Sequence, residues 1–227
     1  MVVLPSSPLL HSFWSLLTRL GDSELLLPLV PLAAMWLWLG AGQTALARRW
    51  ILSLSAAALF TAASKIAFFG WQLGVARWDF TGFSGHAMFS CACWPMLAWV
   101  VVMHRGRAAQ WLGVGFGFAM GLAIAYSRLP VQAHSVSEVI TGALLGLAVS
   151  ASCLPLLRTG PALPLWVPAG AVALLALLVV AAPPSRTQDM IEQISLELSG
   201  HERVYTRHDL RRQLAPRDLQ QRAEVRP

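Results

Sequence analysis

The sequence predicts an all-α integral membrane protein, a six-helix transmembrane bundle with an N-terminal amphipathic helix. Of its 227 residues, 56% are hydrophobic and only 12% are charged, whereas a soluble domain carries about 25% charged residues. Its ten Trp residues fit this class, because indole rings favour the interface between bilayer and water. Apolar runs of spanning length recur along the chain, and a helix satisfies its own backbone hydrogen bonds within lipid.

Six apolar runs are the predicted spans. Most approach the ~20 residues that cross a hydrocarbon core of ~30 Å; the first, interrupted by Pro28 and Pro31, and the fourth are shorter. The runs are Leu25–Gly40, Trp50–Trp71, His86–Met103, Trp111–Tyr126, Ser135–Leu157 and Leu163–Ala182. They make up a membrane domain of residues 25–182, between an N-terminal segment (1–24) and a polar C-terminal tail (183–227).

The N-terminal segment carries a helical pattern of its own. Between Pro8 and Gly21, apolar residues recur at helical spacing with polar residues opposite them. This pattern is typical of a helix that lies on the membrane, and packing against the bundle explains it equally well. Residues 1–10 contain no basic stretch, so we expect the first span to be an uncleaved anchor.

The formal charge of +6 is explained by membrane topology, and we expect no nucleic-acid partner. Short loops on one side of the predicted bundle are basic, and such loops mark the cytoplasm. The basic residues are Arg48, Arg49, Arg105, Arg107 and Arg158. The other side, which holds both termini of a six-span chain, is therefore predicted to face the periplasm or cell exterior. We assign no chemistry to the tail.

Residues that bear chemistry gather on this exterior side. They lie at the same predicted depth although they are spread over more than seventy positions: Lys65, Ser84, Gly85, His86, Ser127, Arg128, His134 and Glu138. Ionisable residues at membrane depth are costly and usually functional. Each has a simpler explanation, such as an interfacial Lys or a helix cap. The convergence of four helix ends favours a common site.

Two histidines and one carboxylate provide candidate catalytic groups. His134 and Glu138 are four residues apart, so their side chains share one helix face. The carboxylate would accept the proton on one imidazole nitrogen and leave the other as a nucleophile. His86 begins the third span, where it would protonate a leaving oxygen. Glu138 also follows Ser135 by three residues, so a capping box is the alternative explanation for it.

The remaining residues are suited to hold a phosphate. Lys65 and Arg128 supply positive charge, and a guanidinium binds two oxygens at once. Ser84 and Gly85 precede a helix, where free N–H groups and the helix dipole favour an anion. No cluster of carboxylates is apparent in the sequence, so we expect neither a metal nor a cofactor.

These residues form three groups in chain order: Lys65; Ser84-Gly85-His86; and Ser127-Arg128 with His134 and Glu138. The order resembles the signature of the type 2 phosphatidic acid phosphatase superfamily, over roughly residues 65–157. That superfamily includes membrane lipid phosphatases, bacterial acid phosphatases and vanadium haloperoxidases. The resemblance implies that His134 forms a phosphohistidine, His86 is the general acid and Glu138 stands where the family has Asp. Lys65, Arg128, Ser84 and Gly85 would hold the phosphate.

The chain departs from that signature in its first two parts. Where the family has Arg-Pro, seven residues after the Lys, this chain has Gln72 and Leu73. Arg77, five residues further on, is a candidate for the missing phosphate-binding cation. Phe83 replaces the usual Pro before Ser-Gly-His. A second Ser199-Gly200-His201 in the tail is interpreted as a coincidence, because no apolar span follows it.

The expected function is metal-independent hydrolysis of a phosphate monoester or diphosphate of a membrane lipid. Undecaprenyl diphosphate, phosphatidylglycerophosphate, phosphatidate and phosphorylated lipid A are all compatible, and nothing in the sequence selects among them or indicates an oligomeric state. A haloperoxidase is disfavoured because its relatives of that type are soluble. The main alternative is a membrane scaffold or transporter with a degenerate site, which the lost Arg-Pro pair would suit.

Overall fold

A computed structural model describes residues 8–164, 167, 169–170, 173 and 187–213. The described residues form helices joined by loops. The β-type pairing found among them is an isolated bridge between Val75 and Phe80. The helices are α1 (Pro8–Arg19), α2 (Ser23–Met35) with a π-helical turn (Trp36–Gly40), α3 (Thr44–Trp71), α4 (Gly85–Val102), α5 (Arg107–Ser127), α6 (Val136–Cys153), α8 (Thr187–Ser199) and α9 (Arg207–Arg212). Short 3-10 turns lie at Ala76–Trp78 and Leu154–Leu156.

Five helical stretches of the described chain are long and apolar enough to cross a membrane. They are Ser12–Gly40, Thr44–Trp71, Gly85–Val102, Arg107–Ser127 and Val136–Leu156. The expected all-α class is therefore confirmed for the described residues, and the spans are those of a multi-pass membrane protein. The sixth expected span, Leu163–Ala182, lies mostly outside the described residues.

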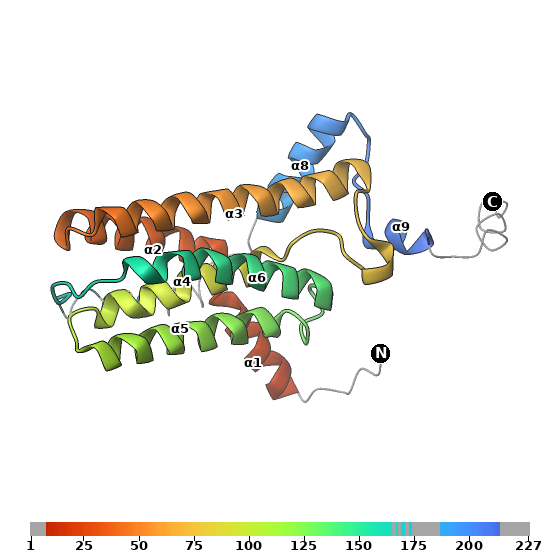
Figure 1. Cartoon of the computed structure of the whole chain (residues 1–227). Coiled ribbons are helices and arrows are strands. Elements are labelled where there is room, and N and C mark those ends of the chain that lie inside the picture. Colours follow the sequence, from red (N-terminus) through yellow and green to blue (C-terminus); the bar gives the residue numbers. More distant parts are fainter. Residues whose placement is uncertain (1–7, 165–166, 168, 171–172, 174–186, 214–227) are drawn as a thin grey trace, which may run out of the picture.

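The spans run side by side with alternating direction (Figure 1). One end of the bundle holds the α3–α4 loop and the α5–α6 loop, together with α1, α8 and α9. The basic residues Arg48, Arg49, Arg105, Arg107 and Arg158 flank helix ends at the opposite end. We call the first end the site end, because it holds the candidate residues described below.

Helix α4 lies at the centre of the bundle, and two glycines of α6 allow a close approach to it. A Cβ atom on Gly142 would lie 2.5 Å from the carbonyl oxygen of Ser84, and one on Gly146 would lie 2.2 Å from that of Met88. Any larger residue would therefore push the two helices apart. This is the small-residue packing by which membrane helices bring their backbones together, and it places the first turn of α6 against the first turn of α4.

The core around α4 is filled by large apolar side chains and by the three cysteines. Trp50 and Trp99 are fully buried, and the indole of Trp50 donates to the carbonyl of Ala92 at 3.1 Å. Cys91, Cys93 and Cys153 are buried free thiols, as expected for small hydrophobic residues. These side chains hold α4 against the neighbouring helices.

Helix α1 packs against the bundle through its C-terminal half. The rings of Trp14 and Tyr126 meet at 5.5 Å between centroids, and the indole of Trp94 donates to the carbonyl of Leu20 at 3.2 Å. A Cβ on Gly21 would overlap atoms of Ser90 and Ile124. The turn between α1 and α2 is thus inserted between helices at the site end. Whether the exposed N-terminal half lies on the membrane stays a prediction.

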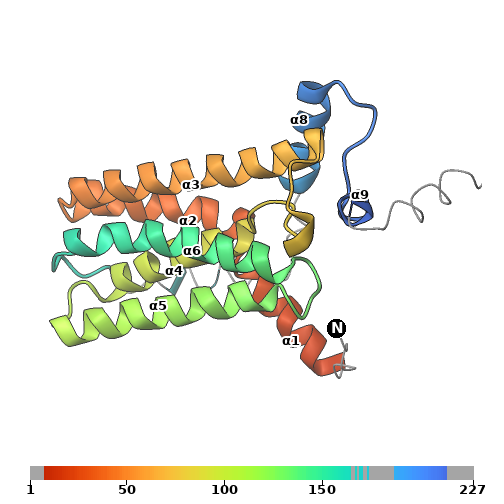
Figure 2. The same ribbon diagram turned by 45° about the vertical axis from the view of Figure 1, so that its right-hand side comes forward.

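The tail docks onto the C-terminal end of α3 (Figure 2). The backbone N–H of Tyr205 donates to the carbonyl of Phe69 at 2.9 Å, and the imidazole Nδ1 of His201 lies 2.8 Å from the carbonyl of Gly70. Leu210 of α9 is fully buried, close to where a Cβ on Gly74 would lie. The Ser199-Gly200-His201 sequence therefore ends α8 and anchors the tail.

Candidate phosphate site

Two helix starts and their caps set the framework of the site. Ser84 caps α4, with its hydroxyl accepting from the N–H of Ala87, and Ser135 caps α6 in a capping box with Glu138. The two starts are joined directly, because the N–H of Ser84 donates to the carbonyl of Glu138 at 3.1 Å. The second and third parts of the signature are thereby brought together.

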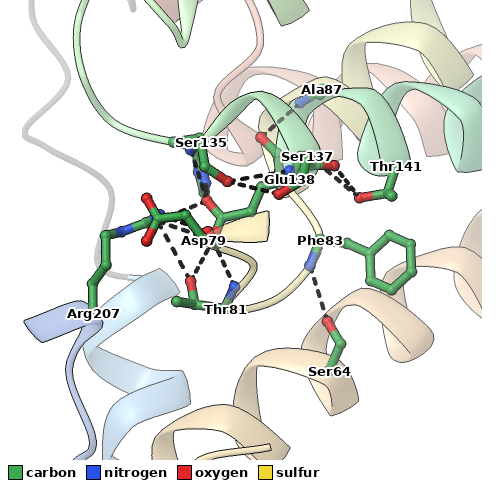
Figure 3. A network of polar contacts seen from close by, with 12 residues as sticks. Ser64, Asp79, Thr81, Phe83, Ala87, Ser135, Ser137, Glu138, Thr141 and Arg207 are labelled. Atoms are coloured by element: carbon green, nitrogen blue, oxygen red, sulfur yellow. Dashed lines mark hydrogen bonds and ion pairs between the residues drawn. The ribbon is translucent and has the colours of Figure 1, made fainter. Parts of the chain in front are cut away.

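The Glu138 carboxylate is fully buried and accepts hydrogen bonds from five donor groups. Figure 3 shows Thr81 and Arg207 among its partners. Its donors are Thr81 N at 2.8 Å, Thr81 Oγ1 at 2.5 Å, Ser135 N at 3.1 Å, His134 Nδ1 at 2.8 Å, and Arg207 Nη2 at 2.9 and 2.8 Å from the two oxygens. The predicted His134–Glu138 contact is therefore confirmed, and so is the capping box. The two explanations do not compete, since one carboxylate makes both contacts.

The contact with Glu138 determines which nitrogen of His134 carries the proton. An ionised carboxylate only accepts hydrogen bonds, so Nδ1 is the protonated nitrogen and Nε2 keeps its lone pair. Burial lowers the pKa of His134 to about 4; Lys65 and Arg128 also lower it, and together they outweigh the opposing effect of Glu138. The imidazole is thus neutral at physiological pH, as a nucleophile must be.

His86, in the first turn of α4, has a partner that sequence reasoning missed. Its Nε2 lies 2.5 Å from a carboxylate oxygen of Asp22, the residue that precedes α2. The contact joins residues 64 positions apart. Asp22 lies at the start of the first span, on the same predicted side as His86, and that position was the only signal available in the sequence.

Arg128 follows the last residue of α5, and one of its side-chain N–H groups has no hydrogen-bond partner among the described residues. Its Nη1 donates to the hydroxyl of Thr18 at 2.7 Å, whereas its Nε is buried without a hydrogen-bond partner among the described residues. Burial lowers the pKa of Arg128, and the charge of Asp22 opposes this shift. A buried guanidinium N–H without an acceptor costs free energy, and an anion bound there would remove that cost.

Lys65 and His134 line one cavity of about 280 Å³, which the tail helps to enclose. Its lining residues are Lys65, Phe68, Phe69, Thr81, Gly82, Ala133, His134, Gln188, Glu192, Val204, Tyr205, Thr206 and Arg207. Gly82 has φ of +138°, and a Cβ there would lie 3.1 Å from the Lys65 side chain. Only glycine readily allows the loop to run so close to Lys65.

Ser84, Gly85, His86 and Arg128 do not line this cavity. They belong to the same end of the bundle, where Ser84 contacts the first turn of α6 and Arg128 lies near enough to lower the pKa of His134. The candidate residues thus share one end of the bundle. Lys65 lines the cavity with His134, whereas Ser84, Gly85, His86 and Arg128 lie at the start of α4 and the end of α5.

Arg77 does not reach the cavity. It is exposed in the turn Ala76–Trp78, whereas Gln72 ends α3 in a left-handed conformation with φ of 56°. A further cation that lines the cavity with Lys65 is Arg207, from the tail to which the sequence interpretation gave no chemistry. Its position could not be inferred from spacing, because 69 residues separate it from Glu138.

A larger cavity of about 490 Å³ lies near the opposite end and offers less chemistry. It is lined by Trp99, Arg107, Gln110, Trp111, Val114, Leu154, Pro155, Leu157 and Thr159, a set without a candidate nucleophile or general acid. Elsewhere in the described ranges, no three His, Cys, Asp or Glu side chains gather as a metal site would require. Independence from metal remains a prediction.

Comparison with known proteins shows a relative of similar length. The sequence is 36% identical over 205 residues to an "uncharacterized 22.5 kDa protein in cps region" of Klebsiella pneumoniae, and the match covers 88% of this chain and 98% of that protein. The chain belongs to the same family as that protein. No family model matches the sequence, and neither does any solved structure. That relative is itself uncharacterized, so only the residues of the site indicate an activity.

Proposed function

We propose that this protein is a lipid phosphatase of the type 2 phosphatidic acid phosphatase superfamily. The observation that carries the proposal is the pairing of His134 Nδ1 with the buried Glu138 carboxylate at 2.8 Å, which leaves Nε2 as the basic nitrogen. A neutral imidazole beside two fixed cations, Lys65 and Arg128, is suited to attack a phosphate ester.

In the proposed reaction, His134 Nε2 attacks phosphorus and the bond from phosphorus to the lipid oxygen breaks. His86 donates a proton to that leaving oxygen, which departs as an alcohol or, from a diphosphate, as a phosphate. Water then attacks the phosphohistidine and gives its proton to His86. Inorganic phosphate leaves, and both histidines return to their starting states.

The cations would offset charge on the phosphoryl oxygens throughout this cycle. Phosphoryl transfer depends on positioning and electrostatic stabilisation more than on covalent assistance. The unpartnered Nε of Arg128 supports an oxyanion close to the end of α5, and Lys65 borders the cavity beside His134. The first turn of α4, capped by Ser84, would add backbone donors from Gly85 onward.

A lipid substrate fits the depth of the site. The candidate residues lie where apolar helices end, which is the headgroup level of a bilayer. The described part of the tail and the α1–α2 turn lie at this same end. The arginines at the opposite end favour a cytoplasmic location for that end and an exterior or periplasmic location for the site.

The test is phosphate release by the purified protein in detergent micelles that contain one lipid phosphate at a time. We expect release from at least one lipid among phosphatidate, phosphatidylglycerophosphate, undecaprenyl diphosphate and phosphorylated lipid A.

Release should persist in excess EDTA, and vanadate should inhibit it as a mimic of the five-coordinate phosphoryl group. Full loss in EDTA with rescue by magnesium would contradict the metal-free site. No release from any lipid would favour the scaffold or transporter.

A further inference from the structure

The guanidinium of Arg207 links two carboxylates that belong to different parts of the site. Its Nη2 contacts both oxygens of Glu138, at 2.9 and 2.8 Å, and its Nη1 donates to the side chain and the carbonyl of Asp79, each at 2.9 Å. Among the described lysines and arginines, Arg207 is the one that forms an ion pair with Glu138. The tail thus supplies the counter-ion of the buried carboxylate.

This contact depends on a tail that is docked at several points. Thr206 caps α9 in a capping box with Asp209, and the preceding Tyr205 is held by the backbone of Phe69. Arg211, one turn after Arg207, also pairs with Asp79 at 2.7 Å. Docking therefore does not rest on Arg207 alone, and the contact that distinguishes Arg207 from Arg211 is the one with Glu138.

A buried carboxylate with one cationic partner is sensitive to the loss of that partner. Glu138 must stay ionised and keep one oxygen toward His134 Nδ1, and removal of a buried counter-ion leaves an uncompensated charge. Burial lowers the pKa of Arg207, but its hydrogen bonds to Glu138 and Asp79 outweigh this effect and raise it. Arg207 therefore remains charged, and its two amino groups tie the Glu138 carboxylate to Asp79 of the α3–α4 loop.

We propose that the C-terminal tail completes the active site, with Arg207 as the positioning residue that holds Glu138 in place to orient His134. This inference rests on the proposed phosphatase function. Arg207 acts through Glu138 rather than on the substrate, because its two amino groups are occupied by Glu138 and Asp79. It therefore does not take over the phosphate-binding role of the Arg that the first motif lacks.

The pH dependence of kcat/KM tests the positioning role of Arg207, because a purely structural role would not shift it. The charged groups around His134 are Glu138 on α6, Lys65 on α3, Arg128 at the end of α5 and Arg207 on α9, with Glu192 of α8 beyond Lys65. Activity is lost as pH falls through the pKa of His134, because protonation removes the nucleophilic lone pair. Loss of the Arg207 charge raises that pKa, so the acid limb of kcat/KM should move upward by about one pH unit.

The experiment compares Arg207→Ala, Arg207→Lys and the matched control Arg211→Ala, all in the full-length protein. We expect Arg207→Ala to lower kcat by about 10- to 100-fold with KM within about threefold, since the lost interaction serves the transition state. Arg207→Lys should be intermediate, because an ammonium keeps the charge but lacks the two separate amino groups that contact Glu138 and Asp79 at once. Arg211→Ala should stay within about twofold of wild type, with the acid limb in place.

Wild-type kcat and an unmoved acid limb in Arg207→Ala would overturn the role of Arg207 while leaving the phosphatase function intact. Equal losses in Arg207→Ala and Arg211→Ala, with no change in the pH profile, would reduce the role to docking. Absence of phosphate release from the wild-type protein would instead refute the proposed function, and this inference would fall with it.

A disulfide tests the docked tail directly. A Cβ on Gly70 would lie 3.3 Å from the Cβ of Ser199, close to the separation of a disulfide. Gly70→Cys with Ser199→Cys should therefore cross-link on oxidation, and the oxidised protein should keep its turnover because the docked tail belongs to the active state. Turnover that disappears on oxidation and returns with reductant would mean that the docked tail blocks the site. Failure to cross-link would contradict the docking itself.

Discussion

Replacement of His134 by Ala is expected to lower turnover of a lipid phosphate by at least about 10³-fold, because the nucleophile of a two-step reaction has no substitute. Replacement of His86 should cost about 10² to 10⁴, the usual contribution of a general acid. The double variant should be little worse than His134→Ala, since residues of one catalytic cycle do not contribute additively. The measurement is phosphate release per folded molecule.

His104, near the opposite end of the bundle, offers the matched control for these two substitutions. It follows α4 and lies away from the site, so His104→Ala should keep turnover within a few-fold of wild type. Half of the wild-type activity in His134→Ala would mean that another residue, or water itself, attacks the phosphorus.

Glu138→Gln is expected to lower turnover by at least about 10²-fold and to destabilise the protein as well. In a serine-protease triad the corresponding change from carboxylate to amide costs about 10⁴. The side-chain oxygens of Glu138 face the donors of Thr81, Ser135, His134 and Arg207. An amide would turn an NH₂ group toward at least one of them and leave Arg207 without its counter-charge.

Glu138→Asp distinguishes the effect of the negative charge from the effect of side-chain length. It keeps the carboxylate but is one methylene shorter, so we expect turnover between those of wild type and Glu138→Gln. The cap alone is worth only about 1 kcal/mol, and melting temperature records the loss of stability separately from the loss of turnover. If Glu138→Gln had wild-type turnover per folded molecule, Glu138 would be a helix cap and nothing more.

Local spacing predicted the part of the site that lies within one helix. His134 and Glu138 share a face of α6, Ser135 caps it, and Ser84 caps α4, all as their spacing indicated. These contacts depend on helix geometry, which short sequence patterns determine directly. The ends of the helices were predicted less accurately. Helix α3 begins at Thr44, six residues before the apolar run that starts at Trp50, because a helix can continue beyond the hydrocarbon core.

The partners of the catalytic groups lie beyond what spacing can predict. Asp22 reaches His86 from the α1–α2 turn, and Arg207 reaches Glu138 from the tail. Both contacts depend on how separate elements dock onto the bundle, and no periodicity in the chain encodes that docking. The arginine nearest in sequence, Arg77, was the natural candidate for a missing cation, but the turn that carries it leaves its side chain in solvent.

The most direct test of the central claim is whether a phosphoryl group forms on His134 during turnover. The protein would be mixed with a lipid phosphate that it hydrolyses, quenched within one turnover, and mapped by mass spectrometry under conditions that preserve phosphohistidine. The account predicts a phosphorylated His134 that forms and decays at rates consistent with kcat and is absent from His134→Ala. Steady turnover with no phosphohistidine, or with the phosphoryl group on another residue, would contradict it.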